Sequence, residues 1–234
     1  MKRIWWIVLA LLLVAIPLVA IGASQPQQIP LKATSLIVEI NSTDGDAGLQ
    51  PSLDGDPWKR LQMYWPDGRI LFDMTTKGEL RNYGLTELFS ESSEPAFTEF
   101  PLNEFKRLFP EGEYRVVATA IDGVKMVGFD TLTHDFPAGP EIISPKADAI
   151  VVPGDLMIEW KPVTQPVGIN IVGYQVLVVA DNPKRVFSAD LPAATTTVTV
   201  PGEFLQAGTE YKVEVLAIEV SGNQTLSEIP FVTE

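Results

Sequence analysis

The sequence predicts an all-β protein of two tandem antiparallel β-sandwiches that follow an apolar N-terminal segment. Three observations support this class: short runs alternate between apolar and polar residues, turn residues separate the runs, and one stretch occurs twice. Alternation with a period of two is typical of half-buried strands, because successive side chains point to opposite faces. The chain of 234 residues is also long enough for two domains, since domains commonly contain about 100 to 150 residues.

The N-terminal segment has the layout of an export signal. Lys2 and Arg3 precede an uncharged apolar run from residue 4 to residue 21. The run is longer than the roughly 7 to 15 residues of an ordinary signal-peptide core and slightly shorter than the roughly 20 that cross a bilayer. Residues 1–24 are therefore predicted to be a cleaved signal peptide or an N-terminal membrane anchor. Both alternatives leave the rest of the chain exported, because the positive charges stay on the cytoplasmic side. We expect a protein that is secreted, periplasmic or anchored at the outer side of the cytoplasmic membrane.

The composition excludes several functions. The formal net charge is −13 and the chain has no cysteine. A surface this acidic repels phosphate backbones, so we expect no nucleic-acid partner. The missing thiols exclude disulfides, thiolate metal sites and cysteine nucleophiles. We expect an unknown protein or glycan partner, and contact with a membrane only through residues 1–24 if that segment is not cleaved.

A proline- and glycine-rich stretch divides the exported region. The sequence "HDFPAGPEIISP" has no helical periodicity, and such clusters commonly join domains. We predict a decorated β-sandwich domain over residues 31–138 and a second sandwich over residues 139–234. In the second region, "LMIEW", "YQVLV" and "TVTV" alternate with a period of two, as expected of sandwich strands.

One strand and the turn before it occur once in each region. The sequence "EYRVVATAID" contains Tyr114, and "EYKVEVLAIE" contains Tyr211 at the matching position. A leucine lies six residues before each tyrosine, at Leu108 and Leu205. We infer two copies of one strand-and-corner unit, each of which closes its own domain.

Residues 140–234 resemble a fibronectin type III domain. The resemblance rests on the proline-rich start, Trp160, "GYQVLV" and "LQAGTEYKVEVLAIEVSGN". It implies a tyrosine corner at Tyr211, whose hydroxyl hydrogen-bonds the backbone upstream. It also implies that one face of this strand points inward, namely Tyr211, Val213, Val215 and Ala217.

The resemblance over residues 31–138 is partial. "PEGEYRVVATAIDG" and "MVGFDTLTHDFP" look like the last two strands of the same fold, whereas the middle of the region is long and acidic. A short helix is predicted from Leu102 to Phe109. We expect a decorated immunoglobulin-like sandwich; the alternative is a different β fold that shares only the last hairpin.

The stretch "NSTDGDAGLQPSLDGDPW" is the candidate metal site. It contains four aspartates: Asp44, Asp46, Asp54 and Asp56. An EF-hand loop needs glycine at position 6 and glutamate at position 12. Position 12 is Gly55 when counted from Asp44 and Trp65 when counted from Asp54, so an EF-hand is excluded.

Two interpretations of these aspartates remain. A looser calcium site would form if the residues between the two pairs folded back, because calcium takes six to eight oxygen ligands. Alternatively, Asp-Gly forms tight turns, and the same dipeptide recurs at Asp67 and Asp122. The recurrence favours turns, so we predict no cofactor, with calcium as the alternative.

The candidate catalytic residues are few. His134 is the only histidine, and no Gly-x-Ser-x-Gly motif occurs, so a serine hydrolase is not predicted. The acidic loop "LFSESSEPAFTEF" offers carboxylates for glycosidic chemistry or is simply solvated. Its acidic residues are Glu91, Glu94 and Glu99.

Aromatic residues offer a second type of site. Alternation along "WKRLQMYW" places Trp65 in the core, on the side of Leu61 and Met63, and leaves Trp58 and Tyr64 facing out. Outward rings would form a platform on which a sugar stacks, whereas inward rings would simply fill the core.

We predict a non-catalytic extracytoplasmic binding, spacer or adhesion module whose ligand is unknown. The alternatives are a carbohydrate-binding accessory protein and a hydrolase that uses carboxylates of the first domain. Because a fold does not fix a function, these alternatives stay open at the level of the sequence.

Overall fold

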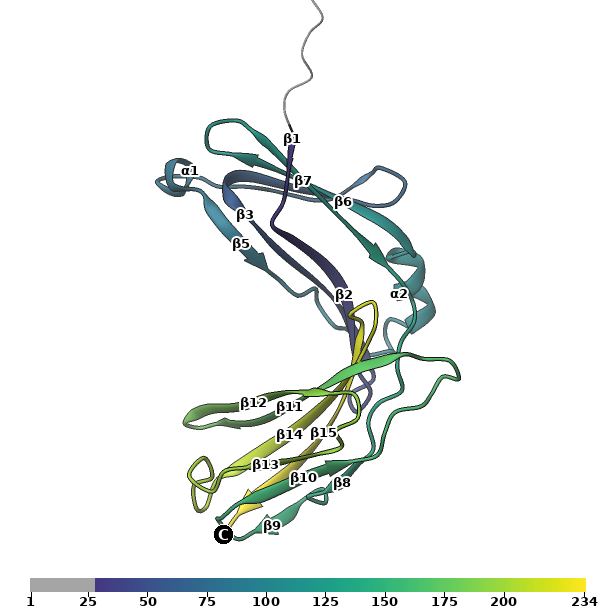
Figure 1. The fold of residues 1–234 in the computed structure, drawn as a ribbon, viewed down its shortest axis with the longest axis vertical. Coiled ribbons are helices and arrows are strands. Elements are labelled where there is room, and N and C mark those ends of the chain that lie inside the picture. The colour runs from purple at the N-terminus through teal and green to yellow at the C-terminus, as the bar shows by residue number, and fades with distance from the viewer. Residues whose placement is uncertain (1–27) are drawn as a thin grey trace, which may run out of the picture.

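The computed structural model describes residues 28–234, so the predicted signal or anchor segment lies outside the described residues. Figure 1 shows two β units, one after the other along the longest axis. The N-terminal unit contains β1 (Gln28–Pro30), β2 (Ala33–Asn41), β3 (Asp46–Tyr64), β4 (Ile70–Thr75), α1 (Leu80–Tyr83), β5 (Leu85–Phe89), α2 (Leu102–Leu108), β6 (Gly112–Ala120) and β7 (Lys125–Leu132). The C-terminal unit contains β8 (Ile142–Ser144), β9 (Ala149–Val151), β10 (Leu156–Trp160), β11 (Ile171–Asp181), β12 (Lys184–Pro192), β13 (Thr197–Val200), β14 (Glu210–Glu219) and β15 (Gln224–Thr233). The mostly β fold class is confirmed.

The C-terminal unit is a sandwich of two sheets. β8, β10 and β13 form one sheet, and β12, β11, β14 and β15 lie side by side in the other. The predicted inward face of β14 is confirmed, because its four side chains are all at most 3% exposed, namely Tyr211, Val213, Val215 and Ala217. The tyrosine corner is also present, since the Gln206 amide donates to the Tyr211 hydroxyl at 2.8 Å.

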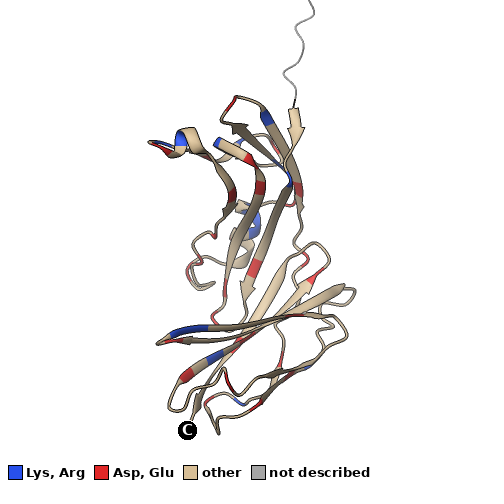
Figure 2. Cartoon of the chain, turned by 60° about the vertical axis from the view of Figure 1, so that its left-hand side comes forward, with Lys and Arg blue, Asp and Glu red and all other residues tan. Residues whose placement is uncertain are grey.

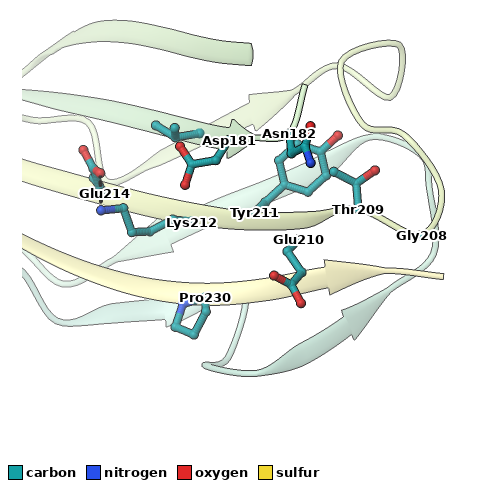
Figure 3. A pocket seen from close by; sticks show the side chains of 10 residues that line it. Asp181, Asn182, Gly208, Thr209, Glu210, Tyr211, Lys212, Glu214 and Pro230 are labelled. Atoms are coloured by element: carbon teal, nitrogen blue, oxygen red, sulfur yellow. Dashed lines mark ion pairs between the residues drawn. The ribbon is translucent and has the colours of Figure 1, made fainter. Parts of the chain in front are cut away.

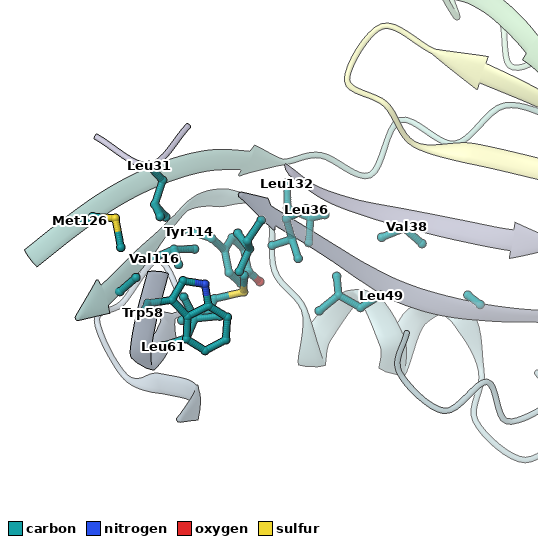
Figure 4. Close-up of a cluster of buried hydrophobic side chains, with 14 of the residues drawn as sticks. Leu31, Leu36, Val38, Leu49, Trp58, Leu61, Tyr114, Val116, Met126 and Leu132 are labelled. Carbon is teal, nitrogen blue, oxygen red and sulfur yellow. The ribbon is translucent and has the colours of Figure 1, made fainter. Parts of the chain in front are cut away.

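The N-terminal unit is built around the long strand β3. The first half of β3 pairs with β2 and β5, and the second half pairs with β4 and β6. β7 and β1 extend the sheet beyond β6, and the Leu36 amide of β2 donates to Asp130 of β7 at 2.6 Å. Figure 4 shows the core between these strands, around Trp58, Leu61 and Tyr114.

The other local predictions for the N-terminal unit are also met. The helix expected from Leu102 is α2, and its Phe105 is buried in the core. Tyr114 makes the second corner, because its hydroxyl donates to the Pro110 carbonyl at 3.0 Å. The one-turn helix α1 was not predicted. The boundary between domains near residue 138 stays a prediction.

The predicted orientation of Trp58 is wrong. Its side chain is 1% exposed and lies in the core with Leu61 and Met63. The register of β3 against β6 shifts between Trp58 and Arg60. A bulge of this kind adds one residue to a strand, so Trp58 and Leu61 share a face although they are three residues apart. Trp65 packs against the core only partly.

One strand ladder joins the two units. β15 of the C-terminal unit pairs in parallel with β2 of the N-terminal unit, with Gln224 opposite Glu39 and Leu226 opposite Asn41. A single 12-stranded sheet therefore runs through both units.

Candidate functional site at the junction of the two units

A buried asparagine lies where the two units meet. Asn223, in the turn between β14 and β15, is 1% exposed. Its side-chain oxygen accepts a hydrogen bond from the Val38 amide of β2 at 2.9 Å. Its side-chain nitrogen donates to the carbonyl and hydroxyl oxygens of Thr133, each at 3.0 Å. One side chain of the C-terminal unit thus satisfies backbone groups of two segments of the N-terminal unit.

The backbones approach closely around this asparagine. The Ser42 amide donates to the Leu226 carbonyl at 2.9 Å, and the Glu228 amide donates to the Thr43 hydroxyl at 2.9 Å. Gly222 has a φ of +94°, and a Cβ there would lie 2.9 Å from the Ile37 side chain. Glycine fits this turn because other residues rarely adopt positive φ.

Three glutamates gather beside the junction. Glu39 of β2 and the loop residues Glu91 and Glu94 bring carboxylate oxygens within 4.8 Å of one another. We call these three residues the glutamate trio. The Gln50 side chain donates to Glu91 at 2.8 Å, and the Gln224 side chain of the C-terminal unit donates to Glu39. The trio therefore contacts both units, within an acidic chain whose charged residues Figure 2 marks.

Two carboxyl groups of the trio, those of Glu94 and Glu39, have raised pKa values. Burial raises the pKa of Glu94 to about 7, and repulsion from Glu91, Asp46 and Glu39 adds to the effect. Burial also raises the pKa of Glu39, against a hydrogen bond from Gln224 that lowers it. Glu94 consequently changes its charge close to neutral pH.

Replacing Glu94 by glutamine should remove a pH dependence of stability. The raised folded-state pKa means that the protonated carboxyl stabilises the fold fully below pH 4.5, and that this contribution is lost as the pH rises to about 7. Solvent screening at this exposed site limits the effect to less than about 1 kcal/mol. We expect Glu94→Gln to melt about 2 °C higher than the parent at pH 7.5, with no difference at pH 4. Glu99→Gln is the control, and an equal gain at both pH values would contradict the assignment.

The four aspartates of the predicted calcium site do not come together. Asp46 and Asp54 lie at two places along the extended strand β3, about 26 Å apart at about 3.3 Å per residue. Asp56 pairs with Lys32 at 3.0 Å, and Asp44 accepts from the Asn41 side chain at 3.2 Å. One cation cannot contact all four carboxylates, so this ligand set is wrong. The prediction of no cofactor, with calcium as the alternative, stays a prediction.

The reason for this error is the continuity of β3. Asp44-Gly45 forms the expected turn, with Gly45 at a φ of +73°. Asp54-Gly55 lies inside β3 instead. Gly55 packs closely here, since a Cβ at this position would lie 2.8 Å from the Leu31 side chain. The acidic residues that do come together near the first aspartate pair are the three glutamates of the trio.

His134 has a structural environment. Its ring nitrogen Nε2 lies 2.8 Å from the Phe109 carbonyl oxygen, and its ring packs beside Phe136 with centroids 5.7 Å apart. Its backbone amide donates to Glu111 at 2.8 Å. Through these contacts His134 fixes the segment after β7 against the end of α2. This environment is the one expected of a structural histidine.

An open cavity lies on the outer face of β14, with a volume of about 540 Å³ (Figure 3). Lys212 crosses its floor and pairs with Glu214 and Glu228, each at 2.9 Å. Burial alone would lower the pKa of Lys212, but hydrogen bonds to the two carboxylates raise it above its usual range. The positive charge of Lys212 is therefore already balanced by its two carboxylate partners. Asp181 and Glu210 add further negative charge, so the cavity is acidic.

The topology of the C-terminal unit decides which family it resembles. Two sheets of the order given above, the buried Trp160 and the corner at Tyr211 are all present. Residues 147–233 match the family model of the fibronectin type III domain. We refer to the C-terminal unit as the fibronectin type III-like domain.

Three of the solved structures that match the chain are as follows. The fn3 domain of the human collagen alpha-1(XX) chain is 26% identical, with a TM-score of 0.30, and the match covers 42% of this chain and 82% of that one. For the chicken CNTN1 FN1-FN3 domains the identity is 13%, the TM-score 0.34 and the coverage 89% and 65%. For a two-domain segment of chicken tenascin the identity is 14%, the TM-score 0.30 and the coverage 86% and 96%. No curated protein matches the chain.

The described helices are short. Within residues 28–234, none is long and apolar enough to cross a membrane.

Proposed function

We propose that the chain is a non-catalytic extracytoplasmic spacer and binding module, in which the two units form one rigid arm. A fibronectin type III-like domain fits a binding, spacer or adhesion role. The observation that supports the rigid arm is the junction, where Asn223 is buried and β2 pairs with β15.

Such a junction differs from an ordinary domain boundary. Interfaces between domains are commonly small and polar, and relative motion is the usual expectation. Here a bending motion would break main-chain bonds of a β ladder and leave the Val38 amide and the Thr133 carbonyl without the partners that Asn223 supplies. An unpaired buried polar group costs about 1 to 3 kcal/mol, so the observed arrangement of the two units is favoured.

The extracytoplasmic location rests on residues 1–24, whose sequence has the layout of an export signal. The acidic surface disfavours nucleic acid as a partner, so a protein or a glycan is the partner that we propose. The carbohydrate-binding alternative loses one of its platform residues, because Trp58 is buried. The non-catalytic assignment is tested by screening the exported region for turnover of glycosidic and ester substrates, where hydrolysis would contradict it.

The rigid arm can be tested by measuring a distance between spin labels. The chain has no cysteine, so Glu87→Cys in β5 and Ser188→Cys in β12 provide two labelling positions without background. Both positions are exposed and lie in different units. We expect one narrow distance distribution by pulsed electron paramagnetic resonance.

A matched pair within one unit sets the width expected of a rigid body. Glu87→Cys with Thr131→Cys places both labels on the N-terminal unit, and both positions are exposed. If the distribution between the units is as narrow as this control, the arm is rigid. A distribution several times broader would contradict the proposal.

A further inference from the structure

β12 lies at the edge of the large sheet and has a single neighbouring strand. Within residues 28–234, β12 pairs only with β11, and the order of strands in the sheet ends there. Figure 1 shows β12 beside β11 in the fibronectin type III-like domain. The backbone N–H and C=O groups along the other side of β12 therefore face no strand of the described chain.

This edge is long and regular. β12 contains nine residues, whereas the other described strands that pair with only one strand contain at most six. Its register with β11 has no shift from Lys184 to Pro192, and its only proline is this last residue. Natural edge strands are commonly short or interrupted by proline or a bulge, because an unpaired edge is a template for another strand. The edge of β12 has none of these interruptions between its ends.

The side chains of β12 divide between two faces of the sheet. Phe187 points inward and packs against the core, with its ring centroid 6.0 Å from that of Phe204. Arg185 shares this inner face, and its guanidinium carbon lies 5.1 Å from the centroid of the Phe204 ring. The outer face carries four exposed side chains, namely Lys184, Val186, Ser188 and Asp190. The charged groups of the outer face are therefore one cation and one anion.

These two charged residues lie near opposite ends of β12. Neither Lys184 nor Asp190 forms a salt bridge within residues 28–234. On the side of β11, Asp181 lies opposite Lys184, and the Gln175 side chain donates to Asp190 at 2.9 Å. On the side of the free edge, both charged residues lack a neighbouring strand.

One antiparallel register of two β12 strands matches these charges. Side chains that lie directly opposite each other in an antiparallel pair share a face and interact. A two-fold axis at Phe187 would place Lys184 opposite Asp190 of the second copy, and the symmetry repeats this pair. Moving the axis by one residue in either direction would place Lys184 opposite Ser188 or Pro192 instead. The strand is therefore complementary to itself in the register centred on Phe187.

We propose that the edge of β12 is an interface between two copies of this chain, which pair antiparallel about a two-fold axis at Phe187. Main-chain hydrogen bonds would join the two large sheets, and the two pairs of Lys184 with Asp190 would fix the register. The contact is closed, because each copy uses its own edge and leaves none for a third copy. At about 0.15 M salt, the general repulsion between two acidic chains is screened beyond about 8 Å. This inference goes beyond the proposed function and does not depend on it.

Sedimentation of the full chain in a mild detergent tests the pairing. We expect a dimer whose fraction rises with chain concentration. Lys184→Asp would place like charges opposite each other twice, so the dissociation constant of the dimer should rise about tenfold. Asp190→Lys should have the same effect, and the double exchange of both residues should restore the parent value.

Two controls accompany the charge exchange. Lys146→Asp makes the same change of net charge at an exposed position of the same unit, and it should leave the dissociation constant unchanged. Urea unfolding of the Lys184→Asp and Asp190→Lys variants should match that of the parent, because both side chains are exposed.

A spin label on Val186→Cys tests the register directly. A two-fold axis at Phe187 places the two labelled positions diagonally opposite each other, about 7 to 8 Å apart. The continuous-wave spectrum should therefore be broadened, and an excess of unlabelled chain should remove the broadening. The same label on Val167→Cys, which is 89% exposed, should give a spectrum without broadening.

Three results would overturn the proposal. Sedimentation as a monomer at every concentration would leave the edge to a strand of a different protein. A dimer that is insensitive to both charge reversals, or that shows no broadening at position 186, would place the contact elsewhere. Failure of the double exchange to restore the dimer would exclude the register. The rigid arm is tested independently, because an excess of unlabelled parent removes distances between copies from the measurement at positions 87 and 188.

Discussion

Replacing Asn223 by alanine should lower the free energy of unfolding by about 3 kcal/mol and loosen the junction. The substitution removes the acceptor of the buried Val38 amide and the donor to the Thr133 carbonyl. Each backbone group left unpaired away from water costs about 1 to 3 kcal/mol. We expect a clear loss in urea unfolding, together with a broader distance distribution between labels at positions 87 and 188.

Two further variants separate this role from a general effect of losing an asparagine. Asn170 is exposed, so Asn170→Ala should leave stability unchanged within about 0.5 kcal/mol. Asn223→Asp keeps the shape but places a second acceptor oxygen against the Thr133 carbonyl. Burial would raise the pKa of this aspartate, because its charged form is disfavoured away from water. Folding of the variant is therefore favoured only when this carboxyl is protonated, and the free energy of unfolding should be regained as the pH falls.

The outcome at the junction is decisive in both directions. Parent-like stability of Asn223→Ala would mean that the hydrogen bonds to Val38 and Thr133 contribute nothing. Lower stability with an unchanged, narrow distance distribution would mean that the β ladder alone holds the arm. Either result would remove Asn223 from the proposed mechanism of rigidity.

Local patterns in the sequence predicted the local structure well. The resemblance to a fibronectin type III domain predicted the inward face of β14 and the corner at Tyr211, and the repeated stretch predicted the second corner at Tyr114. These features depend on residues within one strand or one turn. The helix α2 was also local, since its apolar and basic residues lie within seven positions of one another.

The junction could not be predicted in this way. Asn223 and Val38 are 185 residues apart in the sequence, and no local pattern connects them. The sequence contained one signal, a polar Asn-Gln-Thr that begins four residues after the end of a predicted core strand. That signal also matches a glycosylation acceptor, yet the structure buries Asn223. Its meaning depends on which strand of the other unit pairs with β15.

The glutamate trio was predicted only in part. Glu91 and Glu94 stood out as members of an acidic loop, whereas no pattern in the sequence singled out Glu39. The loop after β5 folds back over β3, where the Glu94 side chain lies against Gly48, and Gly48 is opposite Glu39. A cluster that depends on the path of a loop cannot be derived from spacing along the chain.

Replacing Trp58 by alanine should be the most damaging single change in the N-terminal unit. The side chain is 1% exposed in the middle of the core, and truncation of a buried tryptophan typically costs about 3 to 5 kcal/mol. The loss combines the transfer of the indole to water with a cavity that the rigid sheets around it cannot close. Denaturant unfolding measures the loss, and Phe129→Ala is the control because Phe129 is 52% exposed in the same unit.

The same substitution also tests the bulge in β3. Strict alternation would place Trp58 in solvent, where truncation costs less than about 0.5 kcal/mol, and only the register shift between Trp58 and Arg60 turns the ring inward. Trp58→Phe extends the test to a variant whose side chain still fills much of the core. We expect its loss of stability to lie between those of the parent and Trp58→Ala. If both variants unfold like the parent, the ring must face out, and the stacking platform for a sugar would again have Trp58 and Tyr64 as its two members.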